Sequence, residues 1–362
     1  MTRIMLTTDA VGGVWRYTME LANSFTRFGA QCVIAVLGPA ATAAQRAEVA
    51  AIPNAMLLDT GLPLDWTASG PEPLEAAAQA LARIAAEQEV DSVQLHAPAL
   101  MGTASWPAPV LAVVHSCVAT WWQAVRGGPL PADLAWRAAA TGRGIARADA
   151  VAAPSASFAS ALRATYRTGR GIVVIHNGRR PHRHAAAGTG RARSVLTAGR
   201  LWDEGKGMSV LDAAATLLPW PVRAAGSVRG PNATVIYLQH LELLGDLDEP
   251  ALADALSDAA VFASTARYEP FGLAVLEAAQ AGCALVLSDI PTFRELWDGA
   301  ALFVPPGDPD ALAATLRVVL SDLDRAEALG QRARAQAARY GADRMARQTW
   351  AVHAAFSSRR AA

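Results

Sequence analysis

Residues 265–282, TARYEPFGLAVLEAAQAG, constrain the fold of this chain more than any other stretch. They follow an apolar run, residues 259–263, that is typical of a buried parallel strand, and they precede a second apolar run, residues 284–287. Between the two runs the sequence predicts a turn at residues 268–271 and then a helix that ends near Gly282. A strand, a turn, a helix and a further strand in this order form the repeating unit of a parallel α/β sheet.

The turn of such a unit lies at the carboxyl end of its strand, which is the edge of a parallel sheet where ligands bind. The first amides of the following helix lack intrahelical partners, so Gly272, Leu273 and Ala274 can offer N–H groups to an anion such as a diphosphate. Glu269 precedes this anion site and Glu277 lies further along the same helix. A sugar nucleotide suits both carboxylates, because one can accept hydrogen bonds from the sugar and the other from the ribose. A solvated turn residue and an exposed helix residue are the alternative for this pair.

Length and charge exclude several classes of protein. The chain has 362 residues, enough for two α/β domains with separate cores, and its 52% hydrophobic and 18% charged residues are typical of a globular protein. A formal net charge of zero argues against a nucleic-acid partner. No secretory signal and no apolar run near the roughly 20 residues of a membrane span is evident, so we expect a cytoplasmic protein without a transmembrane segment. Three dispersed cysteines fit a reducing compartment and predict no zinc site.

The only lysine of the chain, Lys206, stands in a polar loop, residues 199–207, that also contains Arg200. This loop follows a predicted strand at residues 194–198 and is the first strand-to-helix turn of its half, so both cations are expected at the ligand-binding edge. There they could neutralise a diphosphate and stabilise it as a leaving group. A solvated loop with incidental charges is the alternative.

In the first half, two glycines and a histidine follow predicted strands. Gly12 and Gly13 come after a strand at residues 3–8 and allow a close approach of backbone to ligand, although they do not form the G-x-G-x-x-G pattern of dinucleotide sites. A tight turn without a ligand is the alternative for the two glycines. His115 follows a strand at residues 110–114 and should face the ligand-binding edge; a structural histidine is the alternative.

An aromatic segment comes next. We predict a loop that contains Trp121, Trp122 and Arg126, and we assign it to an acceptor site because tryptophan faces stack on sugar rings. One of the tryptophans belonging to the core is the alternative.

The sequence from Glu269 to Gly282, with EPFGL, LEA and AG, and the loop at residues 199–207 together resemble the donor-site signature of the retaining glycosyltransferases of family 4. The resemblance implies the GT-B fold, in which two Rossmann-like parallel-sheet domains face a deep interdomain cleft. It implies an acceptor-side domain at residues 1–178 and a donor-binding domain at residues 192–335. A linker at residues 179–191 and a final helical segment at residues 336–362 that packs back on the first domain complete the expected organisation.

The resemblance also implies roles for individual residues. It implies catalytic roles for Arg200, Lys206, Glu269 and His115, the last against the hydroxymethyl group of the donor sugar. It implies donor contacts for Gly12, Gly13, Pro270, Phe271, Gly272, Leu273 and Glu277.

The expected reaction is therefore transfer of a hexose from a nucleotide diphosphate sugar, UDP-linked in preference to GDP-linked, to a hydroxyl acceptor with retention of anomeric configuration. The acceptor is a carbohydrate, a lipid-linked molecule or a small molecule, and peripheral attachment to the inner membrane face is left open. No cofactor is expected. No Asp-x-Asp motif stands at a suitable strand end, so we also expect no metal. A nucleotide-sugar 2-epimerase and a non-catalytic nucleotide-sugar-binding protein are the alternatives.

Overall fold

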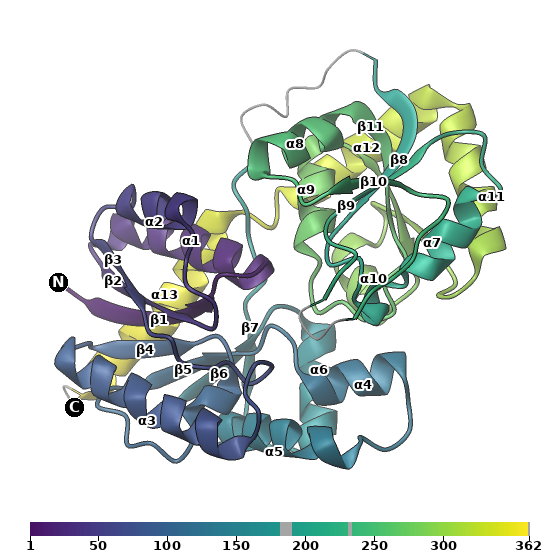
Figure 1. Ribbon diagram of the computed structural model, residues 1–362. Helices are drawn as coiled ribbons and strands as arrows, with labels where there is room; N and C mark the ends of the chain where they lie inside the picture. The colour runs from purple at the N-terminus through teal and green to yellow at the C-terminus, as the bar shows by residue number, and fades with distance from the viewer. Residues whose placement is uncertain (182–189, 231–233, 361–362) are drawn as a thin grey trace. The chain divides into compact units, whose positions relative to one another are not determined.

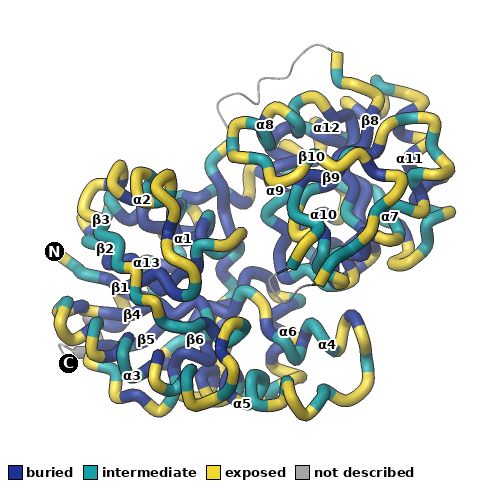
Figure 2. Tube along the Cα trace, viewed as in Figure 1, coloured by how far each residue is buried: buried dark blue, intermediate teal, exposed yellow. Residues whose placement is uncertain are grey.

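The chain folds into two compact units, each built on its own parallel sheet. The computed structural model describes residues 1–181, 190–230 and 234–360, without the side chains of residues 357–360. One unit comprises Met1–Gly178 and Ala342–Ala362, and the other comprises Arg179–Gly341. Helices cover both faces of each sheet (Figure 1), and the central strands of both units are buried (Figure 2). Most of the predicted linker, residues 182–189, lies outside the described residues.

The first unit contains a seven-stranded sheet in the order β3-β2-β1-β4-β5-β6-β7, with every neighbouring pair parallel. Its strands are β1 Arg3–Asp9, β2 Gln31–Leu37, β3 Ala55–Asp59, β4 Ser92–Leu95, β5 Val110–Val113, β6 Ala150–Ala153 and β7 Ile172–Val174. Successive strands extend the sheet from β1 to β3 on one side and from β4 to β7 on the other, so the switch point of the strand order lies between β1 and β4. The crevice outside such a switch point is where doubly wound sheets bind ligands.

The helices of the first unit lie between its strands along the chain, with one exception. They are α1 Gly13–Phe25, α2 Ala43–Ala50, α3 Pro71–Glu87, α4 Val118–Val125, α5 Ala132–Arg147, α6 Ala156–Tyr166 and, from the far end of the chain, α13 Ala342–Arg360. Helix α13 packs against α1 and against the short 3₁₀ helix Thr26–Phe28 that follows it, where the Trp350 and Phe28 rings stack with centroids 5.0 Å apart. His353 of α13 is buried, and its imidazole lies 2.8 Å from the Ser92 hydroxyl and 3.0 Å from Gln94 Oε1. Helix α13 therefore contributes to the core of the first unit.

The second unit contains a six-stranded parallel sheet in the order β10-β9-β8-β11-β12-β13. Its strands are β8 Ala192–Ala198, β9 Val222–Ala225, β10 Glu242–Gly245, β11 Ala259–Ser264, β12 Ala284–Ser288 and β13 Leu302–Val304. Its helices are α7 Met208–Ala215, α8 Glu249–Asp258, α9 Leu273–Ala281, α10 Pro291–Trp297, α11 Pro309–Ser321 and α12 Leu323–Ala337. The switch point lies between β8 and β11, where Leu196 is in register with Phe262. The loops that follow these two strands are those that contain the predicted donor-site motifs.

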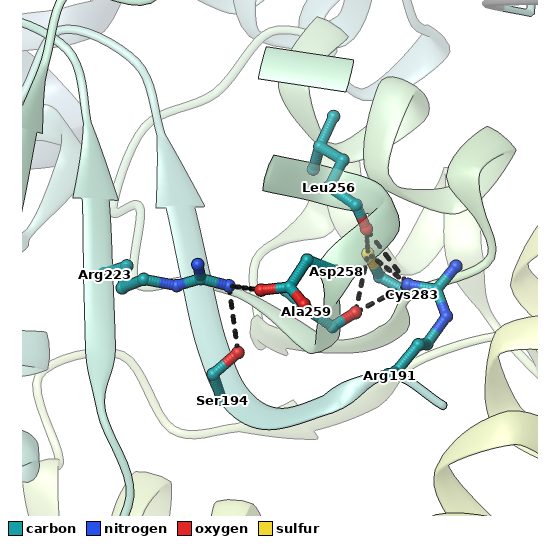
Figure 3. Close-up of polar contacts among 7 residues, drawn as sticks. All are labelled: Arg191, Ser194, Arg223, Leu256, Asp258, Ala259 and Cys283. Atoms are coloured by element: carbon teal, nitrogen blue, oxygen red, sulfur yellow. Dashed lines mark hydrogen bonds and ion pairs between the residues drawn. The ribbon is translucent and has the colours of Figure 1, made fainter. Parts of the chain in front are cut away.

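Two arginines, Arg191 and Arg223, make hydrogen bonds and an ion pair at the amino edge of the second sheet, where its strands begin (Figure 3). The Arg191 guanidinium donates to the carbonyl oxygen of Ala259 at 2.6 Å and to that of Ala281, the last residue of α9. Arg223 at the start of β9 pairs with Asp258 at 2.7 Å. A cation at the carboxyl end of a helix satisfies its last carbonyl groups and complements its dipole. Arg191 thereby fixes the end of α9 that lies away from the predicted anion site.

One predicted loop is wrong. Trp121, Trp122 and the residues around them form helix α4, which ends at Val125 with Arg126 as its C-cap. Turn residues such as Gly127 and Gly128 extended the loop prediction too far upstream, while Val118–Val125 contains no glycine or proline to interrupt a helix.

No helix in the described part of the chain has the length and hydrophobicity needed to cross a bilayer.

Candidate functional site

Two loops meet at the carboxyl edge of the second sheet because the strands they follow are neighbours. The first loop, residues 199–207, follows β8, and the second, residues 265–272, follows β11. The Gly205 carbonyl oxygen accepts hydrogen bonds from the amides of Arg267 at 2.8 Å and Tyr268 at 3.2 Å. The two predicted motifs, more than fifty residues apart in the sequence, are thus bonded to each other through their backbones.

Close packing at Gly207 reinforces this connection. Gly207 has φ +65°, and a Cβ atom there would lie 2.3 Å from the carbonyl oxygen of Thr265, so only glycine fits without movement of the backbone. The Thr265 hydroxyl lies 3.0 Å from the carbonyl oxygens of both Lys206 and Gly207. The position of Lys206 relative to the second loop is therefore fixed by main-chain contacts on either side of it.

Lys206 and Glu269 form the central ion pair of the site. Lys206 ends the short 3₁₀ helix Glu204–Lys206, and its Nζ atom lies 2.5 Å from Glu269 Oε2. The two side chains are 21% and 15% exposed, so the pair is largely shielded and still open to a ligand. The structure brings together the lysine and the first glutamate that the sequence singled out. A cation and a hydrogen-bond acceptor at one position can bind a ligand that has both a phosphate and hydroxyl groups.

The amino end of α9 follows the Lys206–Glu269 pair directly. Gly272 is the N-cap of this nine-residue helix, with φ +92°, and a Cβ atom there would come within 3.2 Å of the Phe293 ring. Pro270 is buried, and Phe271 is 3% exposed with its ring centroid 5.7 Å from that of Tyr340. Phe271 therefore anchors the turn in the core, and the groups that this turn can offer to a ligand are the backbone amides of Gly272, Leu273 and Ala274.

Arg200 occupies the more exposed part of the same loop. Its side chain is 55% exposed, its guanidinium lies 3.2 Å from an Asp203 carboxylate oxygen and its Cζ atom is 5.6 Å from the centroid of the Trp202 ring. Exposed pairs of this kind contribute little to stability. Arg200 can therefore exchange Asp203 for an anionic ligand at small cost.

Glu277 is buried and paired with Arg179, so the alternative of an exposed helix residue is wrong. Its side chain is 10% exposed, and its Oε1 atom lies 2.9 Å from Arg179 Nε. Arg179 also approaches Glu249 Oε1 at 2.9 Å from its Nη2 atom. Sequence reasoning missed Arg179, because we assigned it to a basic, structureless linker.

In the first unit, His115 lies beside a second histidine at the carboxyl end of the sheet. Its ring centroid is 4.6 Å from that of Tyr17 and 5.1 Å from that of His96, both in edge-to-face geometry. Burial lowers the pKa of His115 to about 4, so the imidazole is neutral near pH 7. Its Nε2 atom is buried and lacks a hydrogen-bond partner among the described residues. A neutral imidazole with an unmatched nitrogen can bind a hydroxyl group.

His96 is the other functional candidate that the sequence analysis did not single out. It follows β4 at the switch point, with Nδ1 3.2 Å from the Thr18 hydroxyl and Nε2 2.7 Å from Gln94 Nε2. Burial and the nearby His115 imidazole lower the pKa of His96 well below its ordinary value. Its position directly after a strand, as for His115, was the signal that could have identified it.

The remaining candidates in the first unit lie at the start of α1 and on α4. Gly12 is the N-cap of α1 and Gly13 its first residue, and both are exposed after β1 at the switch point. Trp121 and Trp122 are half-buried, with ring centroids 6.4 Å apart, and Arg126 is exposed. The Trp122 Nε1 atom is buried without a hydrogen-bond partner in the described part of the chain.

Family models match both units. A model described as Glycosyltransferase Family 4 matches residues 11–183, and one described as Glycosyl transferases group 1 matches residues 192–322. The chain belongs to the group 1, family 4 glycosyltransferases. The two matched ranges include every candidate site residue described above.

Curated relatives of this family 4 member match over part of its length. The phosphatidyl-myo-inositol mannosyltransferase of Mycolicibacterium smegmatis is 36% identical over 149 residues, which are 36% of this chain and 36% of the relative. The chain thus spans about a third of the length of curated relatives such as this one.

Solved glycosyltransferase structures match over nearly the whole chain. The sucrose-phosphate synthase of Thermosynechococcus elongatus has a TM-score of 0.75 at 19% identity and covers 99% of this chain and 100% of its own. The Anabaena protein HepE, solved in complex with UDP-glucose, has a TM-score of 0.72 at 17% identity, with 98% and 100% covered. These likenesses show the fold, and the expected GT-B class of two Rossmann-like parallel-sheet domains is confirmed.

No group of three or more histidine, cysteine, aspartate or glutamate side chains is arranged to hold a metal ion within the described ranges. Positive charge at the candidate site comes from Lys206, Arg200 and the amino end of α9.

Proposed function

We propose that the protein transfers a hexose from a nucleotide diphosphate sugar to a hydroxyl acceptor, with retention of the anomeric configuration and without a metal ion. The observation that carries this proposal is the contact of 2.5 Å between Lys206 and Glu269 directly ahead of the α9 amino end. The Lys206 cation and the amides at the start of α9 can bind a diphosphate, and the Glu269 carboxylate can accept hydrogen bonds from sugar hydroxyls. Family membership supports the reaction class, and the mannosyltransferase among the relatives supports a hexose.

In the proposed reaction, the bond between the anomeric carbon and the diphosphate oxygen breaks, and its electron pair remains on that oxygen. Lys206, Arg200 and the α9 amides stabilise the resulting charge. The acceptor hydroxyl attacks the same face of the sugar, and its proton passes to the departing phosphate oxygen. Glu269 exchanges its contact with Lys206 for the sugar hydroxyls, so its role is to orient the sugar and not to act as a base.

The first unit contributes further contacts in this proposal. The neutral His115 imidazole binds the hydroxymethyl group of the sugar, an assignment that the unmatched Nε2 atom supports. The backbone at Gly12 and Gly13 approaches the donor phosphates. The tryptophans of α4 and Arg126 help to shape the acceptor site, where aromatic faces suit a sugar ring.

UDP-sugars are the first choice of donor and GDP-sugars the second. The structural likeness to a protein solved with UDP-glucose supports the first choice. The acceptor class stays open between carbohydrate, lipid-linked and small-molecule hydroxyl compounds.

The single lysine makes a direct test possible. An amine-selective reagent can modify the chain only at Lys206 and at its amino terminus, so mass spectrometry reads one side chain. We expect UDP-glucose or GDP-mannose to protect Lys206 while leaving the amino terminus as reactive as before. Equal modification with and without every sugar nucleotide would contradict the proposed donor site.

Turnover of the same donors tests the catalytic roles. Lys206→Ala and Glu269→Ala should each remain folded and lose donor cleavage by about 10²- to 10³-fold, because each removes charge or orientation from the transition state. Asp298→Ala, a change at an exposed residue of the same unit, serves as the matched control. Nuclear magnetic resonance of the product then reads the anomeric configuration. A donor epimerised without acceptor, or bound without any cleavage, would replace the proposal by one of the two alternatives.

A further inference from the structure

Arg179 is an enclosed cation that the reaction described above does not use. It is the first residue of the second unit, and its side chain is 5% exposed. Two carboxylates from different helices approach its guanidinium, Glu277 from α9 and Glu249 from the start of α8, each at 2.9 Å. Burying a guanidinium is costly unless it is paired in this way, so both contacts stabilise its position.

The backbone of Arg179 is held by the same helix that holds its side chain. The Gln280 side-chain amide donates to the Arg179 carbonyl oxygen at 3.0 Å, and Gln280 lies one turn after Glu277 on α9. From the other side, the Arg179 amide donates to the Tyr340 carbonyl oxygen at 3.2 Å. Arg179 is therefore fixed to α9 by two contacts, through Glu277 and Gln280, and to the segment after α12 by a third.

This arrangement determines the state of the Glu277 carboxylate. Glu277 is almost as buried as its partner, and an isolated ionised carboxylate in such surroundings is unfavourable. The guanidinium beside it favours the ionised form, which accepts hydrogen bonds and donates none. Because the planar guanidinium reaches Glu249 as well, it also restricts the rotation of the Glu277 side chain.

We propose that Arg179 is a positioning residue for donor binding, which holds the Glu277 carboxylate ionised and oriented toward the ribose hydroxyls of the nucleotide. This inference rests on the proposed function, in which Glu277 binds the ribose. Arg179 itself need not touch the ligand. Arg179 affects the binding affinity only through Glu277. Its loss should therefore weaken the binding of nucleotides that have ribose hydroxyls and spare that of nucleotides without them, which the loss of a merely structural residue would not do.

Calorimetric binding to the intact protein tests the inference with four probes: UDP, GDP and the 2′,3′-dideoxy forms of both. For wild type we expect removal of the ribose hydroxyls to weaken binding by about 10- to 100-fold, the effect of hydrogen bonds to a charged group. In Arg179→Met the same ratio should fall to within about threefold, while the affinity for the dideoxy form changes little.

Arg223→Met is the matched control, because Arg223 belongs to the same unit, pairs with Asp258 (Figure 3) and lies near the start of β9. It should keep the wild-type ratio. Arg179→Lys retains the buried charge and guards against misfolding of the methionine variant. Since it lacks the planar fork, its ratio should fall between those of wild type and Arg179→Met.

The outcomes separate this inference from the proposed function. Failure of wild type to bind any of the four nucleotides would overturn the proposed function and the inference together. Binding by wild type without preference for the ribose hydroxyls, or a full wild-type ratio in Arg179→Met or Arg179→Lys, would overturn the inference alone. Equal weakening of both forms in Arg179→Met would reduce Arg179 to a structural residue.

Discussion

Acid should destabilise the first unit, because its buried histidines bind protons only after unfolding. Burial lowers the pKa of His353 from 6.5 to about 3 and that of His115 to about 4. Below pH 6.5 the unfolded histidine takes up a proton and the folded one does not, so the free energy of unfolding falls with pH until the folded pKa is reached. For His353 this loss amounts to about 2 kcal/mol at about pH 5 relative to pH 8.

The substitution His353→Gln isolates one part of this effect. Glutamine can still donate to Gln94 and accept from Ser92, so we expect a loss of only about 1–2 kcal/mol at pH 8. Between pH 8 and 5 the variant should lose about 2 kcal/mol less than wild type. His240→Gln, a change at an exposed histidine of the second unit, serves as the control.

Native-state hydrogen exchange followed by mass spectrometry is the appropriate assay, because a chain of two compact units need not unfold in one step. Peptides from α13 and β4 report on the first unit, and peptides from β11 report on the second. Unchanged pH dependence in the α13 and β4 peptides of His353→Gln would refute the reasoning, as would an equal acid response in the β11 peptides of wild type.

Three further predictions concern the second unit, a helix cap and metal. Gly207→Ala should destabilise the second unit by about 2–4 kcal/mol in urea unfolding, because the new Cβ would clash with the Thr265 carbonyl oxygen. Gly299→Ala, where φ is +76° and the surrounding space is open, should cost only about 1 kcal/mol. Equal losses in the two variants would contradict the packing argument. Ser155→Ala should cost about 1 kcal/mol by circular dichroism melting, since its hydroxyl accepts from the Phe158 amide at the start of α6, and an unchanged melting temperature would show that this cap is dispensable. Incubation with EDTA should change donor turnover by less than about twofold, and a greater loss, restored by added Mg²⁺, would contradict metal independence.

The sequence predicted the centre of the second unit because its signals there are local. The apolar runs around residues 259–263 and 284–287 became β11 and β12, and the helix between them begins and ends within a few residues of its predicted bounds. A strand followed by a turn and a helix places the turn at one edge of the sheet wherever the strand lies. The positions of Lys206 and Glu269 at that edge followed without knowledge of the strand order.

Local signals were insufficient where long-range contacts decide. Arg179 stands in a basic segment without apolar period, and only its pairing with Glu277, 98 positions later by number, makes it part of a core. The same holds for His96, whose neighbours Tyr17 and His115 come from different elements.

The sequence by itself determined the alternation of strands and helices, the family and the two motifs, because these depend on spacing along the chain. The tertiary structure decided the order of the strands, the direct contact of Lys206 with Glu269 and the burial of Glu277 against Arg179. The reason is that parallel strands are joined by crossovers, so the residues that meet at a switch point are distant in sequence, and burial selects their partners.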